Sequence, residues 1–273
     1  MKFYDDFVSF RLLTQPYIKN WGTVLLFRMG FASEIKLKLR DGQIYPLRRV
    51  GYILYLGGLV FVSEDKEHFK DTLHLILDNF VAGQYSALPV KDRYVVDIGA
   101  NIGDTAIRFA VLGAKHVYAY EPFPYIYEIA KWNIIQNRFE RKIKLFNEAV
   151  SDKKSIIKID EKFRSYGNTA LQENSKGKKV SVVTLKEIVK RHELGNSSLK
   201  LDAEGYEYRI ILSSSKATLR KFKYMVLEYH NYSDELVKKL ESVGFKVSVT
   251  PSQDIYHRAT LGKQGLLFAE RVG

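Results

Sequence analysis

The stretch Val95-Val-Asp-Ile-Gly-Ala-Asn-Ile-Gly-Asp-Thr105 joins an apolar run to an aspartate, a glycine turn and the start of a helix-length segment. This order is typical of a strand that ends near Asp97 and turns tightly into a helix. In an open α/β sheet, ligands bind beyond the carboxyl ends of the strands. Gly99 and Gly103 have no Cβ, so the backbone can approach a ligand closely. We therefore expect a ligand site at this turn.

The same turn lacks the features of a phosphate-binding loop. Neither G-x-x-x-x-G-K-[ST] nor G-x-G-x-x-G occurs in it. An aspartate just before the glycines would repel a pyrophosphate, whereas Asp97 could accept hydrogen bonds from an ammonium group. The sequence thus favours a ligand with an amino-acid moiety. In the alternative interpretation, the turn is a plain strand-turn-helix corner in which glycine and aspartate serve only geometry.

A second strand-like run, Val117-Tyr-Ala-Tyr-Glu-Pro122, ends in an acidic residue. The Glu121 carboxylate could accept hydrogen bonds from both hydroxyls of a ribose, as the corresponding acidic residue does in nicotinamide enzymes. A solvated glutamate at a strand end is the structural alternative. Because this residue follows the glycine turn by one strand, the two segments together predict a nucleoside-containing ligand.

The third segment, Phe146-Asn-Glu-Ala-Val-Ser-Asp152, closes the next apolar run. A backbone N–H near Ala149, together with the Glu148 or Asn147 side chain, could read the edge of an adenine. Polar residues after a strand are common, so a purely structural turn is the alternative here.

After Pro89, strand-like runs alternate with helix-length segments, which predicts an α/β fold with a mostly parallel sheet and helices on both faces. We expect helices at about 104–112, 124–137, 184–193, 206–213 and 233–243, and a hairpin-bearing insertion at 151–179. The seven strands are expected at 94–98, 116–120, 142–146, 198–201, 224–228, 246–250 and 265–270.

The beginning of the chain has a different pattern. Residues 1–30 read as aromatic-rich helical segments. Short apolar runs between residues 34 and 63 are separated by Asp41-Gly42 and Gly57-Gly58, which are hairpin signals. We expect a small antiparallel β-meander there, followed by a helix at about 66–81.

The composition narrows the classes of function. There is no cysteine, which excludes disulfides, thiolate zinc sites and cysteine nucleophiles. The formal charge of +12 favours an anionic partner such as RNA, although a lysine-rich solvated surface has the same composition. The apolar stretch 21–27 is too short for a bilayer span of ~20 residues, and it lacks the layout of a signal peptide. We expect a cytoplasmic protein without a membrane span; its oligomeric state stays open.

Taken together, the motifs resemble the FkbM-type methyltransferase family over roughly residues 80–270. This resemblance implies a class I methyltransferase (Rossmann-like) fold with S-adenosylmethionine as the methyl donor. We accordingly divide the chain into two parts. Residues 1–65 form an N-terminal extension, which we expect to serve as a lid or as a wall that selects the acceptor, and residues 66–273 form the methyltransferase domain. The motifs are VVDIGANIGDTA at 95–106, YEPFP at 120–124, NEAVSD at 147–152, LKLDAEGYE at 199–207 and VLEYH at 226–230.

The resemblance also implies which residues bind the donor. The glycine turn would lie against the methionine end, Glu121 would hold the ribose, and Glu148 with Ala149 would flank the adenine. Tyr85, ahead of the first strand, could cover the donor, although a tyrosine buried under the sheet is equally compatible. The predicted donor-binding residues are Tyr85, Asp97, Gly99, Asn101, Gly103, Thr105, Glu121, Pro122, Glu148, Ala149 and Asp202.

The run at 199–207 surrounds the end of the fourth strand, beside the expected methyl group. Asp202 could orient the acceptor or contact the sulfonium, while Glu207 is expected to be structural, as a carboxylate near a helix N-terminus. His230, after the fifth strand, is a candidate general base because imidazole titrates near the working pH. A histidine satisfied by local hydrogen bonds is the alternative. Asp202 and His230 are thus the predicted catalytic residues.

A divalent metal is a further candidate cofactor. Asp202, Glu228 and His230 could converge on an ion through oxygen and nitrogen ligands. The resemblance adds that some related sugar O-methyltransferases use a metal.

Family activity is typically O-methylation of hydroxyls, often on sugars or secondary metabolites, so we expect a small-molecule or sugar acceptor. The tetrapeptides Asn-Pro-Pro-Tyr and Asp-Pro-Pro-Tyr, typical of exocyclic amine N-methylation, are absent from the sequence. An RNA methyltransferase on the same fold and a non-catalytic cofactor-binding protein are the alternatives. A nicotinamide oxidoreductase is disfavoured by the sequence of the glycine turn.

Overall fold

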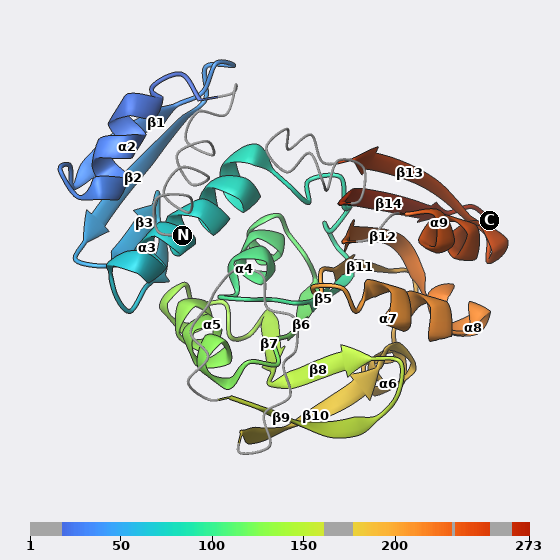
Figure 1. The fold of residues 1–273 in the computed structure, drawn as a ribbon. Coiled ribbons are helices and arrows are strands. Elements are labelled where there is room, and N and C mark those ends of the chain that lie inside the picture. Colours follow the sequence, from blue (N-terminus) through green and yellow to red (C-terminus); the bar gives the residue numbers. More distant parts are fainter. Residues whose placement is uncertain (1–17, 161–176, 231–232, 252–263) are drawn as a thin grey trace. The chain divides into compact units, whose positions relative to one another are not determined.

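The computed structural model describes residues 18–160, 177–230, 233–251 and 264–273 (Figure 1). By their internal contacts these residues form two compact units. One holds the described residues up to Gln84 together with Ile135–Asn137, and the other holds the remainder from Tyr85 onward. The first unit includes the helix at 66–76, whereas the division predicted from the sequence lies between residues 65 and 66. The predicted division concerns the functional roles of the two parts, and it stays a prediction.

The first unit contains the predicted β-meander. Its strands β1 (Glu34–Lys38), β2 (Ile44–Val50), β3 (Ile53–Leu56) and β4 (Leu59–Val62) pair antiparallel in sequence order. In β1 the side chains alternate between exposed and buried, so one face of the meander is covered. The unit also holds α2 (Trp21–Met29), α3 (Lys66–Ile76) and the π-helix η1 (Leu77–Ala82). The helical segments predicted for residues 1–17 lie outside the described residues.

The second unit is built on a seven-stranded sheet with the order β13-β14-β12-β11-β5-β6-β7 (Figure 1). β14 pairs antiparallel with both of its neighbours, and the other neighbouring strands pair parallel. The predicted mostly parallel α/β sheet is confirmed. The strands are β5 (Tyr94–Ile98), β6 (His116–Tyr120), β7 (Ile143–Phe146), β11 (Ser197–Leu201), β12 (Phe222–Tyr229), β13 (Phe245–Pro251) and β14 (Gly265–Arg271).

The strand order reverses between β5 and β11. From β5 the chain builds outward through β6 and β7, and then returns to place β11 and β12 on the other side. A crevice at such a reversal, beyond the carboxyl ends of the strands, is where open α/β sheets bind ligands. Gly99, with φ +75°, lies so close to the end of β11 that a Cβ would stand 1.7 Å from the Asp202 carbonyl oxygen. Only glycine therefore allows this turn to pass β11.

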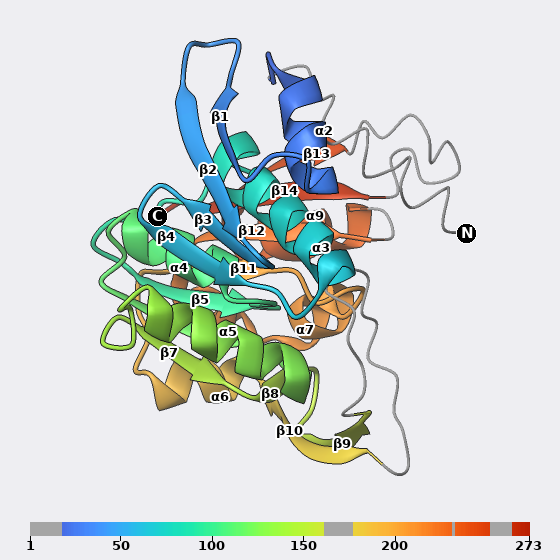
Figure 2. The same ribbon diagram turned by 90° about the vertical axis from the view of Figure 1, so that its left-hand side faces the viewer.

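The insertion forms a second, three-stranded sheet (Figure 2). β9 (Ser155–Ile159) lies within the hairpin-bearing segment predicted at 151–179, and it pairs antiparallel with β10 (Lys178–Thr184), which begins at the end of that segment and extends beyond it. β10 also pairs parallel with β8 (Glu148–Ser151), which the sequence suggested only as a polar strand end. The predicted adenine segment is therefore a strand, held in place by its own ladder.

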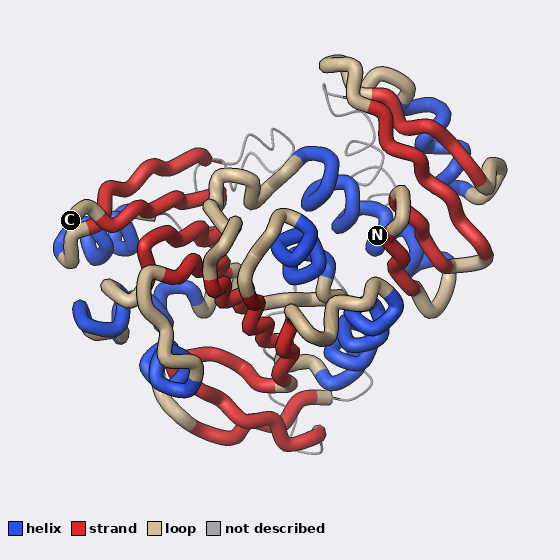
Figure 3. The backbone as a smooth tube through the Cα atoms, turned by 180° about the vertical axis from the view of Figure 1, so that it is seen from behind, coloured by secondary structure: helices blue, strands red, loops and turns tan. Residues whose placement is uncertain are grey.

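Helices cover both sides of the large sheet (Figure 3). α6 (Leu185–Arg191), α7 (Glu207–Ser213), α8 (Lys216–Leu219) and α9 (Asp234–Ser242) share one apolar core with one sheet face. α4 (Asp104–Val111) contacts β5, β6 and β7, and α5 (Pro124–Gln136) follows β6. No helix among the described residues is long and apolar enough to cross a membrane.

Candidate active site

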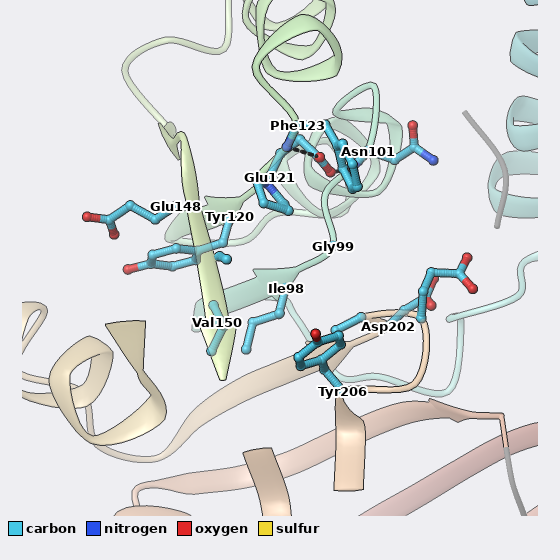
Figure 4. A pocket seen from close by; sticks show the side chains of 14 residues that line it. Ile98, Gly99, Asn101, Tyr120, Glu121, Phe123, Glu148, Val150, Asp202 and Tyr206 are labelled. Carbon is cyan, nitrogen blue, oxygen red and sulfur yellow. Dashed lines mark hydrogen bonds between the residues drawn. The ribbon is translucent and has the colours of Figure 1, made fainter. Parts of the chain in front are cut away.

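A pocket of about 560 Å³, counted to its open mouth, lies at the tips of β5, β6 and β11 and along β8 (Figure 4). The predicted residues that line it are Gly99, Asn101, Glu121, Pro122, Glu148, Ala149 and Asp202. The lining also includes Ile98, Tyr120, Phe123, Val150, Ala203, Glu204 and Tyr206, to which the sequence assigned no role.

Five other predicted residues do not line this pocket. Tyr85 contacts Asp202, His230 contacts Glu204, and Asp97 directly precedes Ile98. Thr105 donates to Asp97, and Gly103 belongs to the same turn. Their roles in holding a ligand or in catalysis stay predictions.

Asp97, at the end of β5, is completely buried. One carboxylate oxygen accepts a hydrogen bond of 2.6 Å from the Thr105 hydroxyl, and the other lies 3.4 Å from the Lys200 ammonium. Burial raises the pKa of Asp97, and Lys200 and Thr105 oppose that rise. The cation that the sequence analysis expected from a ligand is therefore supplied, at this position, by the chain itself.

Lys200, on β11, is 1% exposed and ties the glycine turn to β11. Its ammonium donates to the Gly99 carbonyl at 2.6 Å and lies 3.7 Å from the Asp202 carboxylate. Burial alone would lower the pKa of Lys200, but the charges of Asp97 and Asp202 outweigh it and raise the pKa above its ordinary value. Lys200 therefore stays charged and orients the tips of both strands.

Glu121, after β6, is 4% exposed and its carboxylate is held by two backbone donors. One oxygen accepts from the Asn101 N–H and the other from the Phe123 N–H, each at 2.9 Å. Burial raises the pKa of Glu121 to about 8, although both hydrogen bonds oppose that shift. Each oxygen keeps a second lone pair for a neutral hydroxyl at the pocket.

The adenine side of the predicted site is braced by contacts within the chain. The Asn147 amide donates to the carbonyls of Glu121 and Pro122, both at 2.9 Å, so it holds this loop. The Glu148 carboxylate pairs with Arg191 at 2.5 Å, and Ala149 is buried in β8. Glu148 and Ala149 line the pocket as predicted residues, while Asn147 supports the loop beside them.

The turn after β11 is held by Glu207, which is completely buried. Its carboxylate accepts from the Ala203 N–H at 2.6 Å and from the Gly205 N–H at 2.9 Å. Glu204 lies between them with φ +48°, in the left-handed region that non-glycine residues seldom adopt. Such strain persists only where the surroundings impose it. Glu207 is thus structural, as expected, and it keeps Glu204 in the pocket wall.

Tyr85 links two carboxyl groups at the tips of β11 and β12. Its hydroxyl lies 3.0 Å from both the Asp202 and the Glu228 carboxylates. Burial, and then the charge of Asp202, raise the pKa of Glu228 to about 8. The Tyr85 hydroxyl has a single proton and can donate to only one of these two carboxyl groups. If Glu228 is protonated, it can donate to the Tyr85 oxygen, and Tyr85 can then donate to Asp202.

His230, directly after β12, lies between two glutamates. Its Nδ1 is 3.5 Å from Glu207 and its Nε2 is 3.5 Å from Glu204. Burial lowers the pKa of His230, but Glu207, Glu228 and Asp202 outweigh this effect and raise it to about 9. A general base must be neutral, so the predicted role of His230 requires a ligand that lowers this pKa.

Acidic groups gather where the methyl group is expected. Burial, followed by the charge of Asp202, raises the pKa of Glu204 to about 7. Asp202, Glu204 and His230 each offer one oxygen or nitrogen, and these atoms lie within 4.8 Å of one another. The sequence predicted that Asp202, Glu228 and His230 would converge on a metal. The group in the structure contains Asp202 and His230, with Glu204 as its third member in place of Glu228. The spacing is compatible with one divalent ion, and a metal stays a prediction.

Comparison with known proteins identifies the family. The fold and the pocket define a class I methyltransferase-like protein, and residues 97–247 match the family model described as Methyltransferase FkbM domain. This match spans more than half of the chain. The chain belongs to the FkbM methyltransferase family and is an S-adenosylmethionine-dependent methyltransferase. No curated protein sequence matches the chain significantly.

Several solved structures are similar to the chain at low identity. Precorrin-6y C5,15-methyltransferase of Geobacter metallireducens GS-15 is 15% identical, with 67% of this chain and 82% of that chain covered and a TM-score of 0.39. An rRNA methylase of Streptococcus thermophilus is 12% identical, with 74% and 96% covered and a TM-score of 0.43. A proposed tRNA (m1A22) methyltransferase of Streptococcus pneumoniae, in complex with S-adenosyl-L-methionine, is 15% identical, with 67% of each chain covered and a TM-score of 0.44. At these values the substrates of those proteins have no bearing on this chain.

Proposed function

We propose that the pocket at the tips of β5, β6 and β11 binds S-adenosylmethionine, and that the protein transfers its methyl group to a hydroxyl of a small molecule or sugar. The observation that carries this proposal is the Glu121 carboxylate. It is buried, fixed by two backbone N–H groups and adjacent to the glycine turn at the reversal of strand order. A rigid carboxylate with free lone pairs suits the two hydroxyls of a ribose.

The pocket wall supports one direction for the donor. Figure 4 shows Glu121 between Glu148 on one side and Asp202 on the other. With the ribose on Glu121, the adenine would lie toward Glu148 and Ala149, and the sulfonium toward Asp202. Gly99 and Asn101 would lie along the methionine part, while Asp97, Gly103 and Thr105 would shape the turn from behind.

The chemistry follows from the donor. The acceptor oxygen attacks the sulfonium methyl carbon in line, the C–S bond electrons pass to sulfur, and the hydroxyl proton passes to a base. Alignment of two reactants can supply ~7–11 kcal/mol of the barrier. Asp202 in the pocket wall and His230 beside it are proposed to position the acceptor and to manage its proton.

The charge beside the transfer site favours a small acceptor over RNA. Asp202 and Glu204 line the pocket, and Glu228 is joined to Asp202 through Tyr85. The Asp202 and Glu204 carboxylates would repel the phosphates of a nucleic acid, which proteins bind through lysine and arginine. The overall charge of +12 still supports RNA as the second candidate acceptor.

A transfer assay with methyl-labelled donor tests the acceptor class. The purified full-length protein is incubated with sugars and small hydroxyl compounds on one side and with bulk RNA on the other. Label in a small hydroxyl compound is the expected result. Label in RNA alone would replace the proposed acceptor, and donor binding without label in any fraction would favour the non-catalytic binding protein.

A further inference from the structure

Carboxylates gather at one end of the pocket. At the end formed by β11 and β12, the contacts join four carboxylates, Asp97, Asp202, Glu204 and Glu207, to two cations, Lys200 and His230. Lys200 lies closer to the buried Asp97 than to Asp202, and His230 faces the buried Glu207. Each cation is thus shared between a carboxylate of the wall and one behind it, so four carboxylates meet two cations and this end keeps an excess of negative charge.

Asp202 lines the pocket and carries part of this charge. One of its carboxylate oxygens lies 3.0 Å from the Tyr85 hydroxyl, and the other is buried without a hydrogen-bond partner among the described residues. Glu204 stands beside it in the same wall, fixed there by the turn that Glu207 holds. A carboxylate with an unmet oxygen in a sheltered wall attracts a cation more strongly than one in water.

We propose that Asp202 and Glu204 recognise the positive charge of the donor sulfur, so that the protein binds S-adenosylmethionine more tightly than its demethylated product. This inference rests on the proposed function, in which the ribose lies on Glu121. When the methyl group leaves, the C–S bond electrons remain on sulfur and its charge is lost. The rest of the ligand is unchanged, because both molecules carry the same ammonium, carboxylate, ribose and adenine.

The consequence is a link between chemistry and product release. Transfer removes the one charge that the acidic wall attracts, so the product loses affinity at the moment it forms. Because the acidic wall attracts the charged donor but not the neutral sulfur of the product, the product competes less well for the pocket. Turnover can therefore continue when the product accumulates.

The test compares the two ligands by isothermal titration with the full-length protein. The wild type is expected to bind S-adenosylmethionine at least tenfold more tightly than S-adenosylhomocysteine, which corresponds to ~1.4 kcal/mol. Sinefungin, in which a protonated amine replaces the sulfonium, should follow the substrate. Asp202→Asn keeps the shape of the side chain and should bring the affinity ratio close to one, mainly by weakening the charged ligands. Glu148→Gln, at the opposite end of the pocket, should leave the ratio unchanged.

The outcomes separate this inference from the proposed function. Equal affinities in the wild type, or an unchanged ratio in folded Asp202→Asn, would overturn the charge recognition while leaving donor binding intact. Failure of both sulfur ligands to bind would instead contradict the proposed function. If Asp202→Asn does not fold, Glu204→Gln provides the same comparison, and a ratio like that of the wild type would again overturn the inference.

Discussion

Glu121 and Asp202 stand on opposite sides of one pocket, yet their carboxylates are satisfied in different ways. Glu121 is held by two backbone N–H groups, which fix its position and leave lone pairs for neutral hydroxyls. Asp202 is held by a phenol and a lysine that it shares, and one of its oxygens has no hydrogen-bond partner among the described residues. This difference supports the proposal that Glu121 recognises the shape of the ligand and Asp202 its charge.

Lys200→Met should produce the largest effect, because it removes the cation common to Asp97 and Asp202. Breaking a buried ion pair by deleting one partner costs ~3–5 kcal/mol, since the remaining charge is left uncompensated. Urea unfolding followed by circular dichroism measures the loss. The exposed Lys238→Met should change stability by less than ~0.5 kcal/mol. A similar small change in Lys200→Met would mean that the charge balance at the strand tips is wrong.

Glu121→Ala tests the carboxylate assigned to shape. It should weaken binding of S-adenosylmethionine and S-adenosylhomocysteine alike by at least tenfold, or ~1.4 kcal/mol, because both contain the ribose. Calorimetric titration of both ligands provides the two constants. Unchanged affinity in a folded variant would remove Glu121 from the site. A loss of affinity for only one of the two ligands would mean that Glu121 distinguishes them by the charge on sulfur.

The pH dependence should separate the two carboxylates further. The pKa values of Glu204 and Glu228 are raised to about 7 and about 8, so both groups are neutral below these values and anionic above them. His230, with a pKa near 9, also loses positive charge as pH rises. All three changes make this end more negative, and the other charged groups that face it are Lys200, Asp202 and Glu207.

The affinity ratio of S-adenosylmethionine to S-adenosylhomocysteine should therefore rise several-fold between pH 6 and pH 9. Titration of Glu121, with a pKa of about 8, affects both ligands equally and cancels in the ratio. Calorimetry at several pH values, repeated in Glu204→Gln, checks this. The variant should show a flatter profile, and a ratio that falls as pH rises would contradict the assigned signs.

Metal removal should have the smallest effect. Lys200 and His230 already place positive charge beside Asp202 and Glu204. We expect a chelator to change donor affinity by less than about twofold, because these two cations already balance part of the negative charge that would hold a divalent ion. Titrations in EDTA and in added Mg²⁺ measure this. If donor binding requires Mg²⁺, the protein uses a divalent metal. That result would contradict the proposal that Asp202 and Glu204 recognise the sulfonium directly.

Much of the fold could be predicted because the strands of the large sheet contain short apolar runs, and helix-length segments separate most of these runs. β8 was not expected as a strand, because Asn147 and Glu148 give it a polar beginning and its partner β10 lies beyond the insertion. The four-residue α8 is too short for a periodic pattern to reveal it. These elements are defined by long-range pairing and packing, which a local pattern does not carry.

The candidate site was predictable where chemistry stands at a strand end, as with Glu121 and Asp202. Apolar lining residues such as Phe123 and Val150 cannot be told from core residues by type. Glu204 was placed near the strand end without a role, although the glycine that follows it signals a tight turn. The partner of Asp97 proved to be Lys200, a contact that depends on the order of β5 and β11 in the sheet.

The most direct test of the central claim is a crystal structure of the protein with S-adenosylmethionine or sinefungin bound. We predict ribose hydroxyls on the Glu121 carboxylate, adenine beside Glu148 and Ala149, and the charged centre next to Asp202 and Glu204. A donor bound in the reverse direction, or in a place that leaves Glu121 and Asp202 without ligand contacts, would contradict the division of the pocket into a shape-reading and a charge-reading side.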